Sequence, residues 1–116
     1  MNIDEIREFC LSFPHATEDV KWGNDLAFCV GKKMFAVTGL ETPATSLSLK
    51  CTPEKFAELI ELDGIIPAQY VARYYWVTLQ KLDALKPSEL KDLIRQSYKM
   101  VWKKLPKNLK NRLNSE

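Results

Sequence analysis

The spacing of apolar residues predicts a helix at the start of the chain. Asn2 is a suitable N-cap, since its side chain can accept a hydrogen bond from the first turn. Apolar residues then recur at helical spacing, at Ile3, Ile6, Phe9 and Cys10. Leu11 and Phe13 close this stretch before Pro14, which cannot continue a helix.

From Thr17 to Cys51 the apolar period changes to two, which indicates consecutive short strands. We expect strands at 20–22, 26–30, 34–38 and 45–51. Residues 30–33, with Gly31 in the middle, predict a tight hairpin, and residues 39–44 predict a looser turn containing Pro43. Short connections of this kind make neighbouring strands antiparallel.

A second helix is predicted to begin after Thr52, because a hydroxyl cap precedes Pro53 and Glu54. It should end by 63–64, where Asp63 and Gly64 stand, and residues 65–68 read as extended. A last strand is expected at 74–79. Ser88 is the expected cap of a long helix to about residue 104, and 107–113 suggest one further helical turn.

This order of elements predicts an α+β fold: a mainly antiparallel sheet of about five strands with helices packed on one face. Residues 1–116 form a single domain in this interpretation. Strict alternation directs one set of residues toward the helices: Leu26, Phe28, Val30, Phe35, Val37, Leu47, Leu49, Tyr75, Val77 and Leu79. The open face then carries Ala27, Cys29, Met34, Ala36, Thr38, Ser46, Ser48, Lys50, Tyr74, Trp76 and Thr78.

Composition agrees with one soluble domain. The chain has 116 residues, 46% of them hydrophobic and 28% charged, with a formal charge of +2. Its first residues lack the apolar run of a secretory signal, and no stretch is long enough to span a membrane. We therefore expect a cytoplasmic protein that does not associate with membranes.

The residues of enzyme sites are sparse. Cys10, Cys29 and Cys51 form no C-x-x-C pair, and His15 is the only histidine, so neither a zinc site nor a His-based catalytic set is predicted. The glycines match no nucleotide-binding loop. We expect no catalysis, no cofactor and no metal.

Charge is distributed unevenly along the chain. Residues 1–85 carry a net charge of −4, whereas residues 86–116 carry +6. The basic residues near the end of the long helix are consistent with a solvated face that complements the negative helix terminus, or with a tail that binds anions or nucleic acid. Both interpretations stay open at this stage.

A second set of basic and aromatic residues maps to the sheet and its turns. It consists of Lys21, Trp22, Lys32, Lys33, Lys50, Arg73 and Trp76. Lysines can neutralise phosphates while aromatic rings stack on bases, so this set is the candidate nucleic-acid-binding site. In the alternative interpretation the tryptophans pack internally and the lysines only solubilise the surface.

Five segments identify a family resemblance: K-W-G-N at 21–24, F-C-V-G-K-K-M-F-A at 28–36, L-S-L-K-C-T-P-E at 47–54, Y-W-V-T-L at 75–79 and S-Y-K-M-V-W-K-K-L-P-K at 97–107. In this order they resemble the MmcQ/YjbR family. The resemblance implies a CyaY-like fold, similar to frataxin and to the double-wing DNA-binding domain of a phage transcription factor. Family members are usually labelled DNA-binding on that similarity. By position, it marks Trp22, Lys50 and Trp76 as leading site candidates.

The resulting hypothesis is a monomeric domain that binds double-stranded DNA through a basic and aromatic sheet face. One alternative is a small-ligand or protein-interaction module on the same face. Another is frataxin-like metal binding by a sparse acidic set, Asp4, Glu5, Glu8, Glu18 and Asp19.

Overall fold

The computed structural model describes residues 1–21, 23–39 and 46–115, and it confirms the α+β class. The helices are α1 (Ile3–Leu11), α2 (Pro53–Leu59), α3 (Pro87–Lys103) and α4 (Lys107–Asn114), with a short 3-10 helix η1 (Ala72–Tyr74). The strands are β1 (Thr17–Lys21), β2 (Asp25–Val30), β3 (Lys33–Gly39), β4 (Leu47–Lys50), β5 (Ile65–Pro67) and β6 (Trp76–Leu79). No helix in these ranges is long and apolar enough to cross a membrane.

The strands form one six-stranded antiparallel sheet in the order β1-β2-β3-β4-β6-β5. The predicted antiparallel pairing of the last strand with the sheet of residues 17–51 is confirmed, because β6 pairs with β4. The sheet has one strand more than the sequence predicts, since the extended segment at 65–67 pairs with β6 as the edge strand β5.

Several local signals in the sequence act as predicted. Asn2 and Glu5 form a reciprocal capping box on α1, and the Thr52 hydroxyl accepts a hydrogen bond from the Lys55 N–H at 3.2 Å. The hairpin between β2 and β3 turns at Gly31 and Lys32, whose φ angles are 57° and 67°. A side chain at Gly31 would place its Cβ 2.7 Å from Leu105, so this turn needs glycine for space as well as for conformation.

Other boundaries differ from the prediction. The first strand is Thr17–Lys21 rather than 20–22, and Trp22 and the turn residues 40–45 lie outside the described residues. Helix α3 begins at Pro87 with Lys86 as N-cap, not at Ser88, because proline fits the first helical position. The second helix ends at Leu59, earlier than residue 63.

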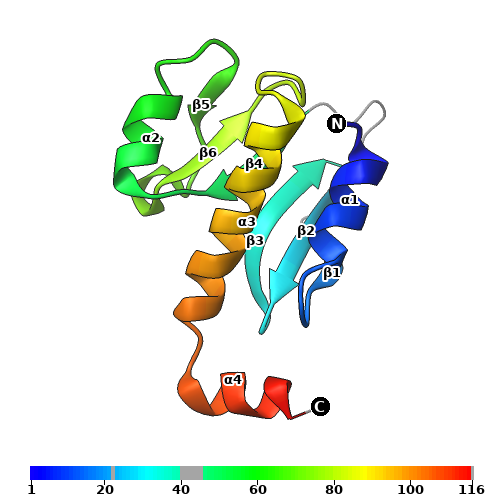
Figure 1. The fold of residues 1–116 in the computed structure, drawn as a ribbon. Helices are drawn as coiled ribbons and strands as arrows, with labels where there is room; N and C mark the ends of the chain where they lie inside the picture. The colour runs from blue at the N-terminus through cyan, green and yellow to red at the C-terminus, as the bar shows by residue number, and fades with distance from the viewer. Residues whose placement is uncertain (22, 40–45, 116) are drawn as a thin grey trace.

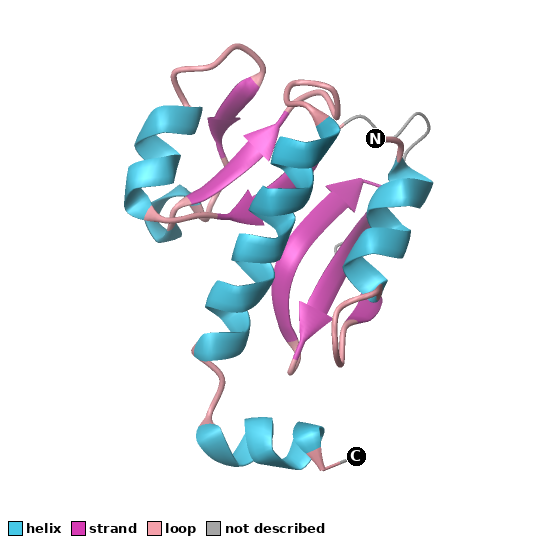
Figure 2. Ribbon diagram, viewed as in Figure 1, coloured by secondary structure: helices cyan, strands magenta, loops and turns pink. Residues whose placement is uncertain are grey.

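Helices α1 and α3 lie side by side against one face of the sheet (Figures 1 and 2). Their interface is aromatic: the Phe13 and Tyr98 rings stack at 4.6 Å between centroids, and Phe35 meets Tyr98 edge-on at 5.3 Å. The Tyr98 hydroxyl donates a hydrogen bond to the Pro14 carbonyl at 2.7 Å. These contacts join the end of α1 to α3 and to the sheet.

A β-bulge in β3 overturns part of the predicted alternation. Phe28 pairs with Ala36 while the next residue, Cys29, pairs with Met34, so Phe35 is the extra residue. Phe35 and Ala36 are therefore both in the core, and the residues after them exchange faces. Thr38, predicted on the open face, is 1% exposed and pairs with Leu47 on the helix side, whereas Val37 pairs with Ser48 on the open face.

The start of the last strand also differs. Residues 72–74 form η1, and Tyr75 has a positive φ of 65°, so β6 begins only at Trp76. The prediction that Tyr74 and Tyr75 lie on opposite faces of this strand is therefore wrong. Both residues precede the strand, and both are exposed. From Trp76 onward the prediction holds: Val77 and Leu79 are fully buried on the helix side.

Strands β3 and β4 separate next to the bulge, and α3 crosses the opening between them (Figure 1). Their last paired residues are Ala36 and Leu49. The neighbouring residues, Phe35 on β3 and Lys50 on β4, are bridged by the fully buried Ser97 of α3. Its hydroxyl donates a hydrogen bond to the Phe35 carbonyl at 2.6 Å and accepts one from the Lys50 N–H at 3.0 Å. One side chain of α3 thus completes the hydrogen bonding that the two strands no longer provide to each other.

Replacing Ser97 with alanine should therefore destabilise the fold. The change leaves a buried carbonyl and a buried N–H without partners, and we expect a loss of roughly 2–4 kcal/mol in the free energy of unfolding. Urea denaturation followed by circular dichroism measures it. Ser48→Ala is the matched control, since it removes only the half-buried hydroxyl contact with Thr78 at 2.7 Å and should cost about 1 kcal/mol. Equal losses in the two variants would contradict the bridging role of Ser97.

Candidate functional site

A cavity of about 340 Å³ lies where β3 and β4 diverge. Lys33 and Met34 from β3, Lys50 from β4 and Trp76 from β6 line one side of it. The end of α3 supplies the other side, with Met100, Val101 and Lys104, followed by Leu105 and Pro106. The cavity therefore joins three of the predicted site residues, Lys33, Lys50 and Trp76, and no acidic side chain of the described residues lines it.

Lys50 is the most constrained cation of this cavity. It stands opposite Trp76 in the β4–β6 pairing, and its ammonium donates a hydrogen bond to the Tyr74 carbonyl at 3.2 Å. Burial lowers the pKa of Lys50, the nearby charge of Lys104 lowers it further, and Cys51 acts in the opposite direction. No acidic residue forms an ion pair with Lys33, Lys50 or Lys104 within the described ranges.

Trp76 occupies the predicted face but not the predicted environment. Its partner Lys50 and its alternation with Val77 place it on the side opposite the helix-covered core. Only 8% of its surface is exposed, however, although it is one of the residues that line the cavity. Such a ring offers little area on which a nucleic-acid base could stack.

The other candidates are dispersed. Lys32 lies at the tip of the β2–β3 hairpin, next to Lys33. Lys21 lies at the opposite end of the strands, paired in register with Asp25, and its ammonium is 3.6 Å from the Asp19 carboxylate. The Arg73 guanidinium lies over the Tyr74 ring at 4.8 Å, just before β6. Trp22 falls outside the described residues.

The structure adds Lys104 and Met100, which sequence reasoning did not place in this site. The basic run at the end of the long helix is visible in the sequence, but there it is consistent with helix-dipole complementation as well as with an anion-binding tail. Its position beside Lys33 and Lys50 depends on how α3 crosses the sheet. No local pattern in the sequence encodes that crossing.

These lysines belong to a larger basic end of the molecule, made by the β2–β3 hairpin, the last turns of α3 and α4. Its residues are Lys32, Lys33, Lys99, Lys103, Lys104, Lys107, Lys110 and Arg112. The hairpin packs against the α3–α4 junction, since Gly31 adjoins Leu105 and Leu109. Neither segment 31–34 nor segment 99–112 contains an acidic residue, so positive charge is concentrated here.

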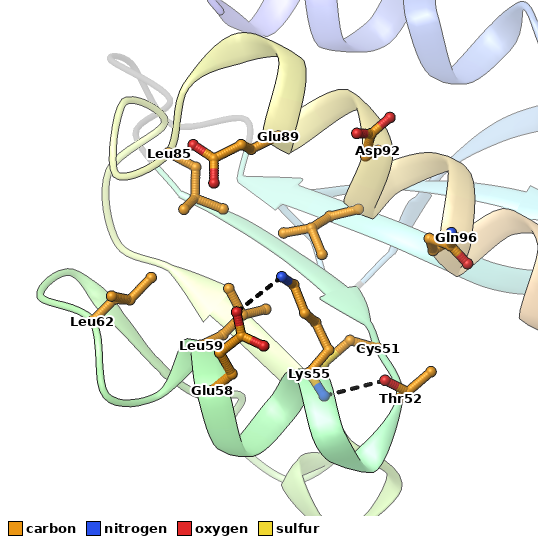
Figure 3. Close-up of a pocket in the computed structure, with 11 residues that line it drawn as sticks. Cys51, Thr52, Lys55, Glu58, Leu59, Leu62, Leu85, Glu89, Asp92 and Gln96 are labelled. Carbon is orange, nitrogen blue, oxygen red and sulfur yellow. Dashed lines mark hydrogen bonds and ion pairs between the residues drawn. The ribbon is translucent and has the colours of Figure 1, made fainter.

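A second concavity, about 430 Å³ in volume, is a groove between α2 and α3 (Figure 3). Its floor is apolar, with Leu59 and Leu93, and its rim carries the carboxylates of Glu58, Glu89 and Asp92. Two of these carboxylates are already partnered: Lys55 pairs with Glu58 at 3.3 Å and Arg95 pairs with Asp92 at 2.7 Å. The groove therefore has the opposite charge from the basic cavity.

The cysteines described by the structure are buried. Burial raises the pKa of Cys51 to about 11 and that of Cys10 to about 12, so both stay protonated thiols at neutral pH. Glu18, from the acidic set considered for metal binding, is paired with Arg7. Within the part of the chain that the structure describes, no three His, Cys, Asp or Glu side chains gather into a possible metal site.

Comparison with known proteins gives the following matches. A family model described as YjbR matches residues 11–100. The crystal structure of the Deinococcus radiodurans protein DR2400, with a DUF419 domain, is similar at a TM-score of 0.87 and 30% sequence identity, covering 97% of this chain and 88% of that chain. A Pseudomonas syringae protein shares the fold at a TM-score of 0.72 and 21% identity, covering 87% of this chain and 99% of that chain. No curated protein matches the chain significantly.

The proximity of the two lysines can be tested by titration. Lys104→Met removes a like charge near Lys50, so the pKa of Lys50 should rise toward its ordinary value, although burial still lowers it. NMR of the lysine Cε carbons across alkaline pH measures this shift. Lys99→Met, which changes an exposed lysine outside the cavity lining, is the control. An unchanged Lys50 pKa in Lys104→Met would contradict the electrostatic coupling.

Proposed function

This chain belongs to the YjbR family, and from that premise we propose that it binds duplex DNA through its basic end. The observation that carries the proposal is the concentration of cations on the β2–β3 hairpin, the last turns of α3 from Lys99 onward, and α4. None of these cations pairs with an acid within the described ranges. Unpaired lysines and arginines at one end of a domain suit a polyanion, because each can replace a counterion on a phosphate.

Helix-dipole complementation explains only part of this charge. The negative end of a helix acts within its last turn, which accounts for Lys103 and Lys104. Lys110 of α4 also meets this end, since its ammonium donates to the Lys103 carbonyl at 3.2 Å. Lys107 of α4 and Lys32 and Lys33 of the hairpin, far away in sequence, are not explained in this way. Folding therefore gathers like charges from three elements, which raises electrostatic repulsion unless an anion is bound.

The proposed contacts are mainly to the phosphate backbone. Trp76 is buried, so it does not supply base stacking as the sequence suggested. Arg73 and the 49%-exposed Tyr74 lie next to Lys50 and extend the surface with donors for phosphate oxygens. Contacts of this kind position a protein on DNA without reading sequence, so we propose binding with little base preference.

The resemblance to the double-wing DNA-binding domain supports the same ligand class, although fold analogy alone does not assign function. The proposal involves no chemical step and no cofactor. We place the protein in the cytoplasm as a monomer, in line with its composition and charge.

Salt dependence tests the proposal directly. Fluorescence anisotropy with a labelled 20-bp duplex should show tight binding at low salt, and the logarithm of affinity should fall by about 0.9 per phosphate contact for each unit of log salt. The double variant Lys107→Gln/Lys110→Gln should lower affinity and reduce that slope by about two units.

The matched control is Lys81→Gln/Lys86→Gln, which removes the same charge from exposed sites before the start of α3. It should leave both affinity and slope nearly unchanged. Absence of binding at low salt, a flat salt response, or equal effects of the two double variants would each refute DNA binding by the basic end.

A further inference from the structure

The cavity at the β3–β4 separation has features that backbone contacts to DNA do not use. Its volume of about 340 Å³ falls in the range of small-molecule sites. Part of its wall is apolar and polarisable, made by Met34, Trp76 and Met100. Three lysines are among the residues that line it, Lys33, Lys50 and Lys104.

We propose that this cavity binds one small organic phosphate, a phosphate monoester of a flat apolar group. The group would lie against the side chains of Met34 and Met100, and the phosphate would meet the three lysines. This site shares Lys33 and Lys104 with the basic end, but it depends on the cavity lining rather than on the exposed cations of α4.

The lysines are arranged to receive an anion rather than to balance an internal acid. Among the residues that the structure describes, no carboxylate lines the cavity. Lys50 uses one N–H on the Tyr74 carbonyl at 3.2 Å, which holds its ammonium in place and leaves two donors free. Burial and the charge of Lys104 both disfavour its charged form, and a bound anion would relieve both effects.

The charge of the site favours a phosphate monoester over a carboxylate. Three lysines complement a phosphate dianion better than a carboxylate monoanion, and a phosphate monoester offers three terminal oxygens to their ammonium donors instead of two. The thioethers of Met34 and Met100 favour a flat aromatic group beside them, because methionine sulfur makes favourable contacts with aromatic rings. Inorganic phosphate alone would leave this apolar wall unused.

Isothermal titration calorimetry with four probes tests the proposal in the absence of DNA. The probes are 1-naphthyl phosphate, 1-naphthoate, 1-naphthol and inorganic phosphate. We expect saturable one-to-one binding of 1-naphthyl phosphate, with each of the other three weaker by roughly tenfold or more, because each lacks the ring, the anion or the second charge. Equal binding of 1-naphthoate would overturn the assignment to phosphates, and equal binding of 1-naphthol would overturn the role of the lysines.

Variants locate the site. Lys50→Met and Lys104→Met should each weaken 1-naphthyl phosphate by roughly tenfold. Lys110→Met, a basic-end lysine outside the lining, should leave it unchanged. Lys104 is exposed, so its variant keeps the test valid if Lys50→Met melts at a lower temperature. No saturable binding at millimolar probe, or equal loss in Lys110→Met, would refute the site. If 1-naphthyl phosphate does not bind while DNA does, this inference is wrong and the proposed function stands. If 1-naphthyl phosphate binds while DNA does not, the proposed function is wrong and this inference stands.

Discussion

The arrangement of this molecule depends on how the backbone is satisfied where β3 and β4 separate. The Phe35 bulge ends their pairing at Ala36 and Leu49, which leaves a carbonyl and an N–H in the interior. Buried backbone groups of this kind must find partners. The Ser97 hydroxyl supplies both, so α3 is held across the opening by hydrogen bonds as well as by apolar packing. The sheet can open here only because a helix with a small hydroxyl residue at this position crosses it.

The opening produces the basic cavity. Once the strands diverge, open-face residues of β3, β4 and β6 meet the last turns of α3 instead of more sheet. Lys33, Lys50 and Lys104, which are distant in sequence, then border one space beside Trp76. The β2–β3 hairpin packs against the α3–α4 junction through Gly31 and Leu105, which adds Lys32 and the lysines of α4 to the same end. Gathering these like charges raises repulsion in the folded state. That repulsion is the physical reason to look for an anion as the ligand.

The molecule is consequently polarised. The groove between α2 and α3 carries carboxylates around an apolar floor, whereas the hairpin, the end of α3 and α4 carry only cations among their charged residues. The two regions lie toward opposite ends of α3, since Glu89 and Asp92 come from its first half and Lys104 follows its last residue. A polyanion approaching such a molecule would be oriented toward the basic end before contact, because a charge asymmetry of this size steers association. The same asymmetry is already present along the chain, where residues 86–116 are basic and residues 1–85 are acidic.

The sequence by itself determined the elements and the fold class. Capping residues such as Asn2 and Thr52, the turn at Gly31 and the change of apolar period act locally, so they can be recognised without the tertiary structure. It also indicated Lys33, Lys50 and Trp76 as site residues. Only the tertiary structure decided that Thr38 faces the core, that Trp76 is buried and that Lys104 joins the site. The physical reason is that one extra residue at Phe35 reverses the faces that follow it. The contact between α3 and the sheet brings together residues about 50 positions apart, such as Lys50 and Ser97, for which no local periodicity exists.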